Sequence, residues 1–465
     1  MSKKPEPLSK GALILQEKPF AYIVQSKFIK ERCDFCLSSG KLLKCSGCEF
    51  SHYCGVLCQR DAWAEHKYEC LCMKKILPRT IPDAARIMAK IIWKLQYGGY
   101  LQKFYYSRNG YRKFNDLMPH LEDIKWDEHR MDHVQTLYAV LKDYLAPEHL
   151  PNQSEFLGIY GRLCINSFNI LDDDLNSIGT GIYLASSILD HSCKPNAVAT
   201  FEGPQLSIRL IEDIPELKWE DIRISYIELL DLPETRREQL RKCYYFDCEC
   251  ERCKDEKERA TMVAMACPKE NCDGQIDVLD EKCKECSTEI KEEHRQNFDD
   301  ILDMTKTLLA EMQETRYIDM CRNLVKRQTN VLHEKNIWRL KTLDLAFEAA
   351  IDFEAWPEAV EYGKRFVKGL SHYTSSLNPL VGIDHLKLGK IYPHLNEFQT
   401  AIHHIREAGD VLKITHGDQS RLMRDFVRPL LRETQILLEE SQRVKLPPPT
   451  EDDEEAEESG EQATA

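Results

Sequence analysis

The 465-residue sequence lacks long apolar runs, and no stretch approaches the roughly 18 apolar residues that a membrane-spanning helix needs. Its first residues, MSKKPEPLSKG, contain no apolar core of a signal peptide. The 19 cysteines are therefore expected to be metal-bound or free thiols in a reducing compartment, and not disulfides. The cysteine-rich segment near the N-terminus has no basic cluster, which argues against duplex nucleic acid as its main ligand. These absences favour an intracellular protein that does not bind nucleic acid directly.

Negative charge gathers at the C-terminus. The net charge is -14, and eight carboxylates with no cation lie between Thr450 and Ala465, after three consecutive prolines. Such a segment cannot bury enough apolar surface to fold, so residues 446–465 are predicted to form a disordered acidic tail. The rest of the chain is long enough for about three domains, each with its own core.

Four pairs of possible zinc ligands follow one another near the N-terminus. The pairs are Cys33 with Cys36, Cys45 with Cys48, Cys54 with Cys58, and His66 with Cys70. A Cys-x2-Cys turn aims two thiolates at one ion, and ligands four residues apart share one helix face. This pattern predicts two zinc sites, since a chance run of buried cysteines seldom shows four ligand-spaced pairs. Zinc would supply the folding free energy of so short a segment.

Hydrophobic periodicity divides the remaining chain into three parts. Helical spacing is clear at 84–95 and 131–145. From Phe156 to Tyr226 the pattern changes to strand signals, with short apolar runs at 198–201, 206–211 and 222–226. Helices return after Arg252 at 338–353, 356–370, 379–392, 397–415 and 420–439. Helix pairs at a period near 40 residues favour a tetratricopeptide-like (TPR-like) solenoid, and an ordinary helical bundle is the alternative.

The central part holds the most specific motif. The run Leu189-Asp190-His191-Ser192-Cys193-Lys194-Pro195-Asn196 is followed by Ile224-Ser225-Tyr226 and then by Cys248-x-Cys250-x2-Cys253. Three cysteines in this spacing need a fourth ligand, and Cys193 is available if the chain folds back. A third zinc would then attach this segment to the strands.

The order of these motifs resembles a SET methyltransferase, and the paired ligands upstream resemble a MYND finger. Nearly the whole chain is similar to the SET-and-MYND (SMYD) lysine methyltransferases. The resemblance implies an α+β fold in which a SET β core carries an inserted MYND finger and a helical insert, followed by an all-α TPR-like C-terminal domain. The implied segments are the N-terminal part of SET 1–32, MYND 33–70, helical insert 71–155, core SET 156–235, post-SET 236–255, a cysteine-containing insertion 256–295, the TPR-like domain 296–445 and the tail 446–465.

The resemblance also implies ligand sets and roles. In MYND fingers the first and third pairs share one zinc and the second and fourth the other. Methyl transfer from S-adenosylmethionine to a protein lysine is the implied reaction, with Tyr226 catalytic. Phe168 and Tyr244 would line the lysine channel, and Cys164-Ile-Asn166-Ser-Phe168 resembles a family strand. The implied cofactor-binding residues are His120, Asn166, Ser187, Asp190, His191, Tyr226 and Phe246.

Two departures from the family pattern bear on catalysis. SMYD proteins open with a strand of the type Arg-Gly-x-Gly-Leu, whose glycines let the backbone approach the cofactor. Here Pro7-Leu8 already matches the next family segment, so the N-terminus looks truncated, as in a shortened isoform, or cofactor binding has been lost or rebuilt. The second departure is Asp190 in place of the family's asparagine, which removes an amide donor.

A fourth set, Cys267, Cys272, Cys283 and Cys286, has ribbon-like ligand spacing. A fourth structural zinc and four free thiols are equally compatible with it. Cys72, Cys164, Cys243 and Cys321 are left over as expected buried small hydrophobes.

Two classes of function remain open at this stage. The first is a monomeric, cytoplasmic and nuclear protein-lysine methyltransferase with three or four zincs that acts on a histone or another protein. The second is a non-catalytic scaffold of transcriptional regulation, in which the MYND finger binds proline-rich peptides.

Overall fold

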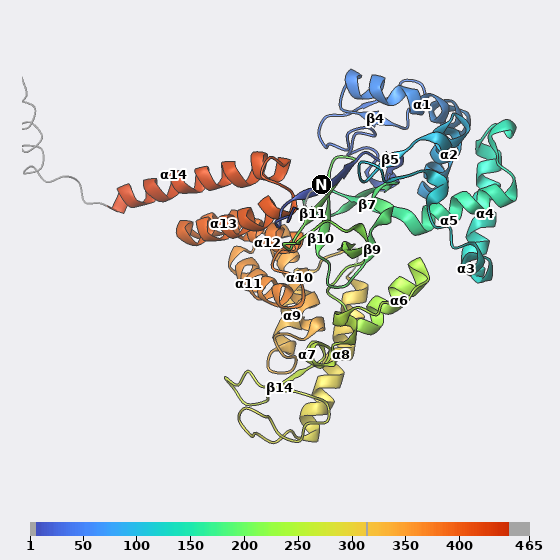
Figure 1. The fold of residues 1–465 in the computed structure, drawn as a ribbon. Coiled ribbons are helices and arrows are strands. Elements are labelled where there is room, and N and C mark those ends of the chain that lie inside the picture. The colour runs from blue at the N-terminus through green and yellow to red at the C-terminus, as the bar shows by residue number, and fades with distance from the viewer. Residues whose placement is uncertain (1–5, 313–314, 446–465) are drawn as a thin grey trace, which may run out of the picture.

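The computed structural model describes residues 6–312 and 315–445. Figure 1 shows strands at the centre of the molecule, with residues 33–166 on one side of them and residues 318–445 on the other. Among the described residues, no helix is long and apolar enough to cross a membrane. The tail predicted at 446–465 lies outside the described residues.

Two three-stranded antiparallel sheets form the β core. One has the order β1 (Leu13–Glu17), β11 (Gln205–Leu210), β10 (Ala197–Glu202). The other has the order β2 (Ala21–Val24), β8 (Ser177–Ile182), β7 (Ser167–Leu171). In β11 every second residue, Leu206, Ile208 and Leu210, is buried, which is the period of a strand with one face on a core.

A short parallel pair positions the central motif. Strand β9 (Asp190–His191) pairs with β12 (Arg223–Ile224), His191 lying opposite Ile224. Parallel strands end at the same edge, so Cys193 and Tyr226, each two residues beyond its strand, leave the pair side by side. The strand predicted at 222–226 is thus real but only two residues long.

The finger is a small hairpin followed by a long helix. Strand β3 (Leu43–Lys44) pairs with β4 (His52–Tyr53), and α1 (Val56–Ile76) follows. Helix α1 carries its buried side chains, His66, Cys70 and Met73 among them, at helical spacing.

Four helices and a hairpin complete this side of the molecule. They are α2 (Asp83–Gln96), β5 (Phe104–Tyr105), β6 (Tyr111–Arg112), α3 (Leu121–Trp126), α4 (Glu128–Tyr144) and α5 (Gln153–Asn166). The helices predicted at 84–95 and 131–145 are therefore confirmed within a few residues.

Helix α5 overturns part of the strand prediction. The stretch from Phe156 to Asn166 is helical, and the expected strand from Cys164 begins only at Ser167. The reason is local: the Asn152 side chain accepts a hydrogen bond from the backbone N–H of Glu155 and caps the helix. The buried residues Phe156, Ile159, Tyr160 and Leu163 then follow helical spacing.

The chain next turns back towards the β core. Helix α6 (Pro233–Tyr244) leads to the short helix η7 (Glu251–Lys254), to α7 (Glu256–Met262) and to the hairpin of β13 (Met265–Ala266) and β14 (Gln275–Ile276). This hairpin has a small core of its own, with Met265, Ile276, Ile290 and Phe298 buried together.

From Glu292 onward the described chain consists of helices and short connections. Its helices are α8 (Glu292–Glu311), α9 (Ile318–Gln328), α10 (Ile337–Asp352), α11 (Trp356–Tyr373), α12 (Pro379–Ile391), α13 (Phe398–Thr415), the π-helix η9 (Leu422–Val427) and α14 (Arg428–Lys445). From α9 to α14, each α-helix packs on its neighbour in the chain. The five helices predicted here are present, although η9 replaces the start of the last one.

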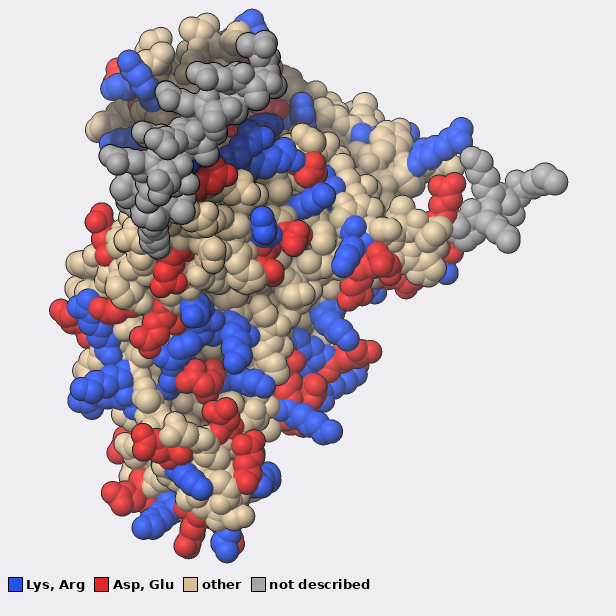
Figure 2. Space-filling model, turned by 90° about the vertical axis from the view of Figure 1, so that its left-hand side faces the viewer, with Lys and Arg blue, Asp and Glu red and all other residues tan. Residues whose placement is uncertain are grey.

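Charges are mixed on the face shown in Figure 2, where lysines and arginines alternate with acidic side chains. Where grey atoms do not cover this face, its basic side chains are interspersed with acidic ones.

Candidate functional site

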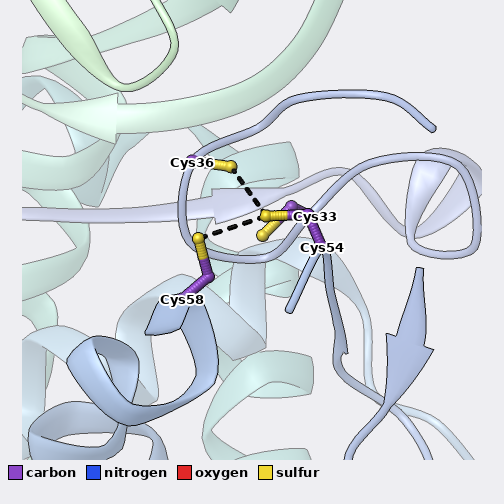
Figure 3. Close-up of side chains that lie close together, drawn as sticks. All are labelled: Cys33, Cys36, Cys54 and Cys58. Atoms are coloured by element: carbon purple, nitrogen blue, oxygen red, sulfur yellow. Dashed lines mark hydrogen bonds between the residues drawn. The ribbon is translucent and has the colours of Figure 1, made fainter. Parts of the chain in front are cut away.

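The eight finger ligands form two interleaved tetrads. Cys33, Cys36, Cys54 and Cys58 form one tetrad, and Cys45, Cys48, His66 and Cys70 form the other, with ligand atoms within 4.8 Å of one another in each. Figure 3 shows the sulfurs of the first tetrad converging from two loops and the start of α1. The grouping is the one that the MYND resemblance implied.

The spacing of these atoms fits zinc. Tetrahedral Zn–S bonds of about 2.3 Å separate neighbouring sulfurs by about 3.8 Å. The Sγ atoms of Cys36 and Cys54 lie 3.7 Å apart, and those of Cys45 and Cys70 lie 3.8 Å apart. The Cys48 Sγ lies 3.6 Å from His66 Nε2, so this histidine presents Nε2 to the metal position.

A buried ionic network supports the second tetrad from behind. His66 Nδ1 lies 3.1 Å from the Glu69 carboxylate, and the Arg86 guanidinium of α2 donates to Glu69 at 2.6 Å and to Asp34 at 2.7 Å. Arg86 and Glu69 are each 1% exposed. Burial by itself would raise the pKa of Glu69, but Arg86 and Lys90 hold that pKa well below its ordinary value. The network fixes the orientation of the His66 ring and ties the finger to α2.

A third tetrad attaches the segment after α6 to the β core. It consists of Cys193, Cys248, Cys250 and Cys253. The Cys193 Sγ lies 3.5 Å from that of Cys253 and 4.0 Å from that of Cys248. The structure thus brings Cys193 to the three later cysteines, as the spacing required.

The fourth cysteine set also closes into a tetrad at the β13–β14 hairpin. Cys267, Cys272, Cys283 and Cys286 have their sulfurs within 4.8 Å of one another. The Sγ atoms of Cys267 and Cys286 lie 3.5 Å apart, and those of Cys272 and Cys283 lie 3.8 Å apart. The chain therefore offers four donor sets suited to zinc.

Elemental analysis should find about four zincs per chain in protein purified without chelator, because each tetrad supplies four soft donors in tetrahedral spacing. The double change Cys283→Ser and Cys286→Ser should remove one zinc, whereas Cys72→Ser, outside the tetrads, should remove none. A wild-type content near three that this double change leaves unaltered would mean that the fourth tetrad holds free thiols.

Tyr226 lies beside the third tetrad in a cluster of aromatic side chains. Its backbone N–H donates to His191 Nδ1 at 3.1 Å, and His191 Nε2 faces the Cys193 Sγ at 3.3 Å. The Tyr226 ring centroid lies 5.0 Å from that of Tyr244, and the His191 centroid lies 6.1 Å from that of Phe246. Residues predicted from three separate motifs therefore meet at one place.

The Tyr226 hydroxyl is protonated near neutral pH and already makes one hydrogen bond. It donates to the carbonyl oxygen of Leu189. Burial, with the Asp190 carboxylate and Tyr244 next in effect, raises the pKa of Tyr226 above its ordinary value. Burial likewise raises the pKa of Tyr244 to about 12. Both side chains are therefore neutral hydroxyls.

A cleft of about 1110 Å³ opens beside this cluster, between the β core and the C-terminal helices. Five of the residues predicted for catalysis, cofactor binding or the lysine channel line it: Asn166, Phe168, Ser187, Tyr226 and Tyr244. Phe168 on β7 packs edge-on against Tyr183, their centroids 5.6 Å apart. Phe168 thus stands in the wall of the same cleft as Tyr226 and Tyr244.

The other predicted residues are placed less centrally. Asp190 has a side chain that is 74% exposed, with Arg223 at 4.0 Å. Asn166 does line the cleft, but its amide group is already bonded, donating to the carbonyls of Met118 and Arg162, both at 2.9 Å. His120 is not among the residues that line the cleft.

His120 instead contacts Asp123 through Nδ1 at 2.9 Å, and its ring lies 5.7 Å from that of Tyr245. Its segment packs against α5, because the Pro119 carbonyl lies against Gly161, where a Cβ atom would lie 2.2 Å from that oxygen. Glycine at this position allows the close approach.

Comparison with known proteins agrees with this geometry. The MYND finger profile matches residues 33–70. The human histone-lysine N-methyltransferase SMYD3 is 30% identical over 90% of this chain and 92% of its own length. The Arabidopsis thaliana histone-lysine N-methyltransferase ASHR1 is 27% identical over 90% of this chain and 89% of its own length. The human N-lysine methyltransferase SMYD2 is 24% identical over 89% of this chain and 91% of its own length. The chain belongs to the SMYD (SET and MYND) family of protein-lysine methyltransferases.

Proposed function

We propose that this protein is an S-adenosylmethionine-dependent protein-lysine N-methyltransferase acting on a histone or another protein in the cytoplasm and nucleus. The convergence of Tyr226, Tyr244 and Phe168 on one cleft carries the proposal. In this proposal, the strands around β9 and β12 form the SET core. Residues 236–255 form the post-SET segment, and the C-terminal helix pairs form a TPR-like domain.

When bound, S-adenosylmethionine supplies an electrophilic methyl group. The side chains present fit such a donor: the partly exposed Phe246 ring offers a face for stacking an adenine, and it adjoins His191. Asn166, Ser187, Asp190 and His120 are the other proposed contacts, of which Asn166 and Ser187 line the cleft.

The lysine must arrive as the neutral amine, because an ammonium has no lone pair. Phe168, Tyr226 and Tyr244 would surround it with aromatic surface, which disfavours the charged form and lowers its pKa from about 10.4. The Tyr226 hydroxyl already donates to Leu189, so its free lone pair would accept an N–H of the amine and orient the nitrogen. Attack then depends on alignment more than on proton relays.

The test is transfer of tritiated methyl from S-adenosylmethionine to protein lysines in a cell lysate, with a binding isotherm for the cofactor measured on the same protein. We expect saturable binding and labelled lysine. The two measurements should be repeated on a protein that carries an added Arg-Gly-x-Gly-Leu segment before Pro7. Failure of both proteins to label any lysine would reject the proposal.

A scaffold function is the second candidate, and one observation favours it. Helix α1 of the finger exposes Val56, Leu57 and Trp63, which are 75%, 65% and 47% exposed. An exposed aromatic among aliphatic side chains suits a proline-rich peptide. Binding of such a peptide, lost on Trp63→Ala, in a protein that labels no lysine would favour the scaffold.

A further inference from the structure

The turn after α6 places two aromatic side chains of the site. Tyr244 lines the cleft, and its ring centroid lies 5.0 Å from that of Tyr226. Phe246 follows two residues later, with its ring centroid 6.5 Å from that of Tyr244. Between them, Tyr245 has the left-handed backbone conformation, at φ 60°. The conformation of Tyr245 therefore sets how its two neighbours lie in the site.

This conformation is strained for a residue other than glycine, and it persists only where the surrounding structure holds it. Tyr245 ends α6, and its backbone N–H donates to the Arg241 carbonyl at 3.0 Å. Its side chain does not line the cleft but contacts the start of α4. The groups that hold the turn therefore lie outside the cleft.

Arg130 of α4 holds the turn through the backbone. One terminal nitrogen of its guanidinium donates to the carbonyls of Lys242 and Cys243, both at 3.0 Å. These carbonyls belong to the last turn of α6, where the helix itself offers them no donor. A cation at this end of α6 also complements the helix dipole.

The Tyr245 side chain adds two further contacts with α4. Its hydroxyl donates to the Asp127 carboxylate at 3.0 Å, and its ring centroid lies 5.2 Å from Arg130 Cζ in a cation–π contact. Partial burial alone would raise the pKa of Asp127, but hydrogen bonds from the Arg130 N–H and the Tyr245 hydroxyl lower it, so the acceptor is ionised. Asp127, Arg130 and Tyr245 together form what we call the α4 clamp.

The stability of α4 alone does not explain an arginine at position 130. Arg130 lies in the first turn of α4, where the helix dipole disfavours a cation. Its ion pair with Asp127 is long, at 3.7 Å. The shorter contacts of its guanidinium are those with the two carbonyls of α6.

We propose that Arg130 is a positioning residue for methyl transfer, because it fixes the turn at Tyr245 and thereby holds Tyr244 in the wall of the lysine channel. The inference rests on the proposed function and adds a residue of the helical insert to it. Arg130 does not line the cleft, so it acts through Tyr244 and not by contact with the lysine. A shift of about 1 Å in a group that orients the amine is enough to slow transfer.

Backbone hydrogen exchange tests the α4 clamp without any assumption about activity. In Arg130→Gln, the Tyr245 amide should exchange about 10-fold faster than in the wild type, because the turn loses its charged donor. Arg428→Gln is the matched control, since Arg428 of α14 also donates to a backbone carbonyl, that of Asp418 at 2.7 Å, and does not line the cleft. Unchanged exchange in Arg130→Gln would overturn the inference.

Transfer rates, measured on a protein that is labelled in the lysate assay, test the positioning role. Arg130→Gln should lower kcat about 10-fold, and Arg130→Lys, which keeps a cation able to donate to both carbonyls, should recover most of this loss. In a Tyr244→Ala background, Arg130→Gln should lower kcat less than about 2-fold, because no ring remains to be positioned. Equal losses in both backgrounds would mean that Arg130 does not act through Tyr244.

A milder variant keeps the test decisive if Arg130→Gln does not fold. Tyr245→Phe removes only the hydroxyl that donates to Asp127, and it should change exchange and kcat in the same direction by a smaller factor. If Tyr245→Phe matched the wild type in both measurements, the clamp would not hold the turn.

Failure of this inference differs from failure of the proposed function. Faster exchange in Arg130→Gln with a wild-type kcat would keep the methyltransferase and reject the positioning role. A wild type that labels no lysine would reject the proposed function, and the exchange at Tyr245 would still decide whether Arg130 holds the turn.

Discussion

Replacing Arg86 by methionine is expected to lower the free energy of unfolding by about 3–5 kcal/mol, because it leaves the buried carboxylates of Asp34 and Glu69 without their cation. The second zinc should also bind more weakly, since Glu69 orients His66. Urea denaturation at saturating zinc measures the first effect, and competition with a chromogenic chelator measures the second.

Arg79→Met is the matched control for this experiment. Its ion pair with Asp143 is longer, at 3.5 Å, and both side chains are largely exposed, at 72% and 70%. Such a pair contributes less than about 1 kcal/mol, so this variant should unfold almost as the wild type does. If the two variants proved equally stable, the network around Arg86 would not be holding the finger in place.

The zinc ligands were predictable from sequence because their spacing along the chain is a local feature. A turn of the type Cys-x2-Cys or a helical i, i+4 pair fixes both ligands, so the tetrads of the finger could be identified before the fold was known. Cys193 required one further step of inference, because Cys248, Cys250 and Cys253 lack a fourth ligand nearby in the sequence. The third tetrad confirms that Cys193 joins them.

The supporting network was not predictable in this way. Asp34, Glu69 and Arg86 look like ordinary surface charges in the sequence, and only the packing of α2 on the finger buries them together. One signal was available: Glu69 lies three residues after His66, which places its carboxylate on the same helix face.

The fold was predictable where periodicity is strong, and it was misread where two patterns compete. Glycines at 158 and 161 interrupt the apolar run after Asn152 and suggested strands, although both lie inside α5. The contribution of the C-terminal helices to the cleft was not predicted for a different reason. Asp344 of α10 would belong to a solvated face of an isolated helix, and it lines the cleft only because the β core packs opposite.

Tyr226→Phe is expected to reduce turnover about 100-fold or more while zinc content and cofactor binding stay unchanged. The substitution removes one hydroxyl that would orient the amine, a loss of about 2.7 kcal/mol of transition-state stabilisation. Within the described structure that hydroxyl has the Leu189 carbonyl as its partner, so the fold loses only about 1 kcal/mol. Single-turnover transfer of tritiated methyl to a protein that is labelled in the lysate assay gives the rate of the chemical step.

Tyr22→Phe separates catalysis from the loss of a hydrogen bond. The Tyr22 hydroxyl on β2 also donates to a backbone carbonyl, that of Phe35 at 2.6 Å, but Tyr22 does not line the cleft. This variant should transfer methyl at the wild-type rate. If Tyr226→Phe did so too, the hydroxyl would not orient the amine, and Tyr226 would serve only to pack Tyr244 and His191 against the third zinc tetrad.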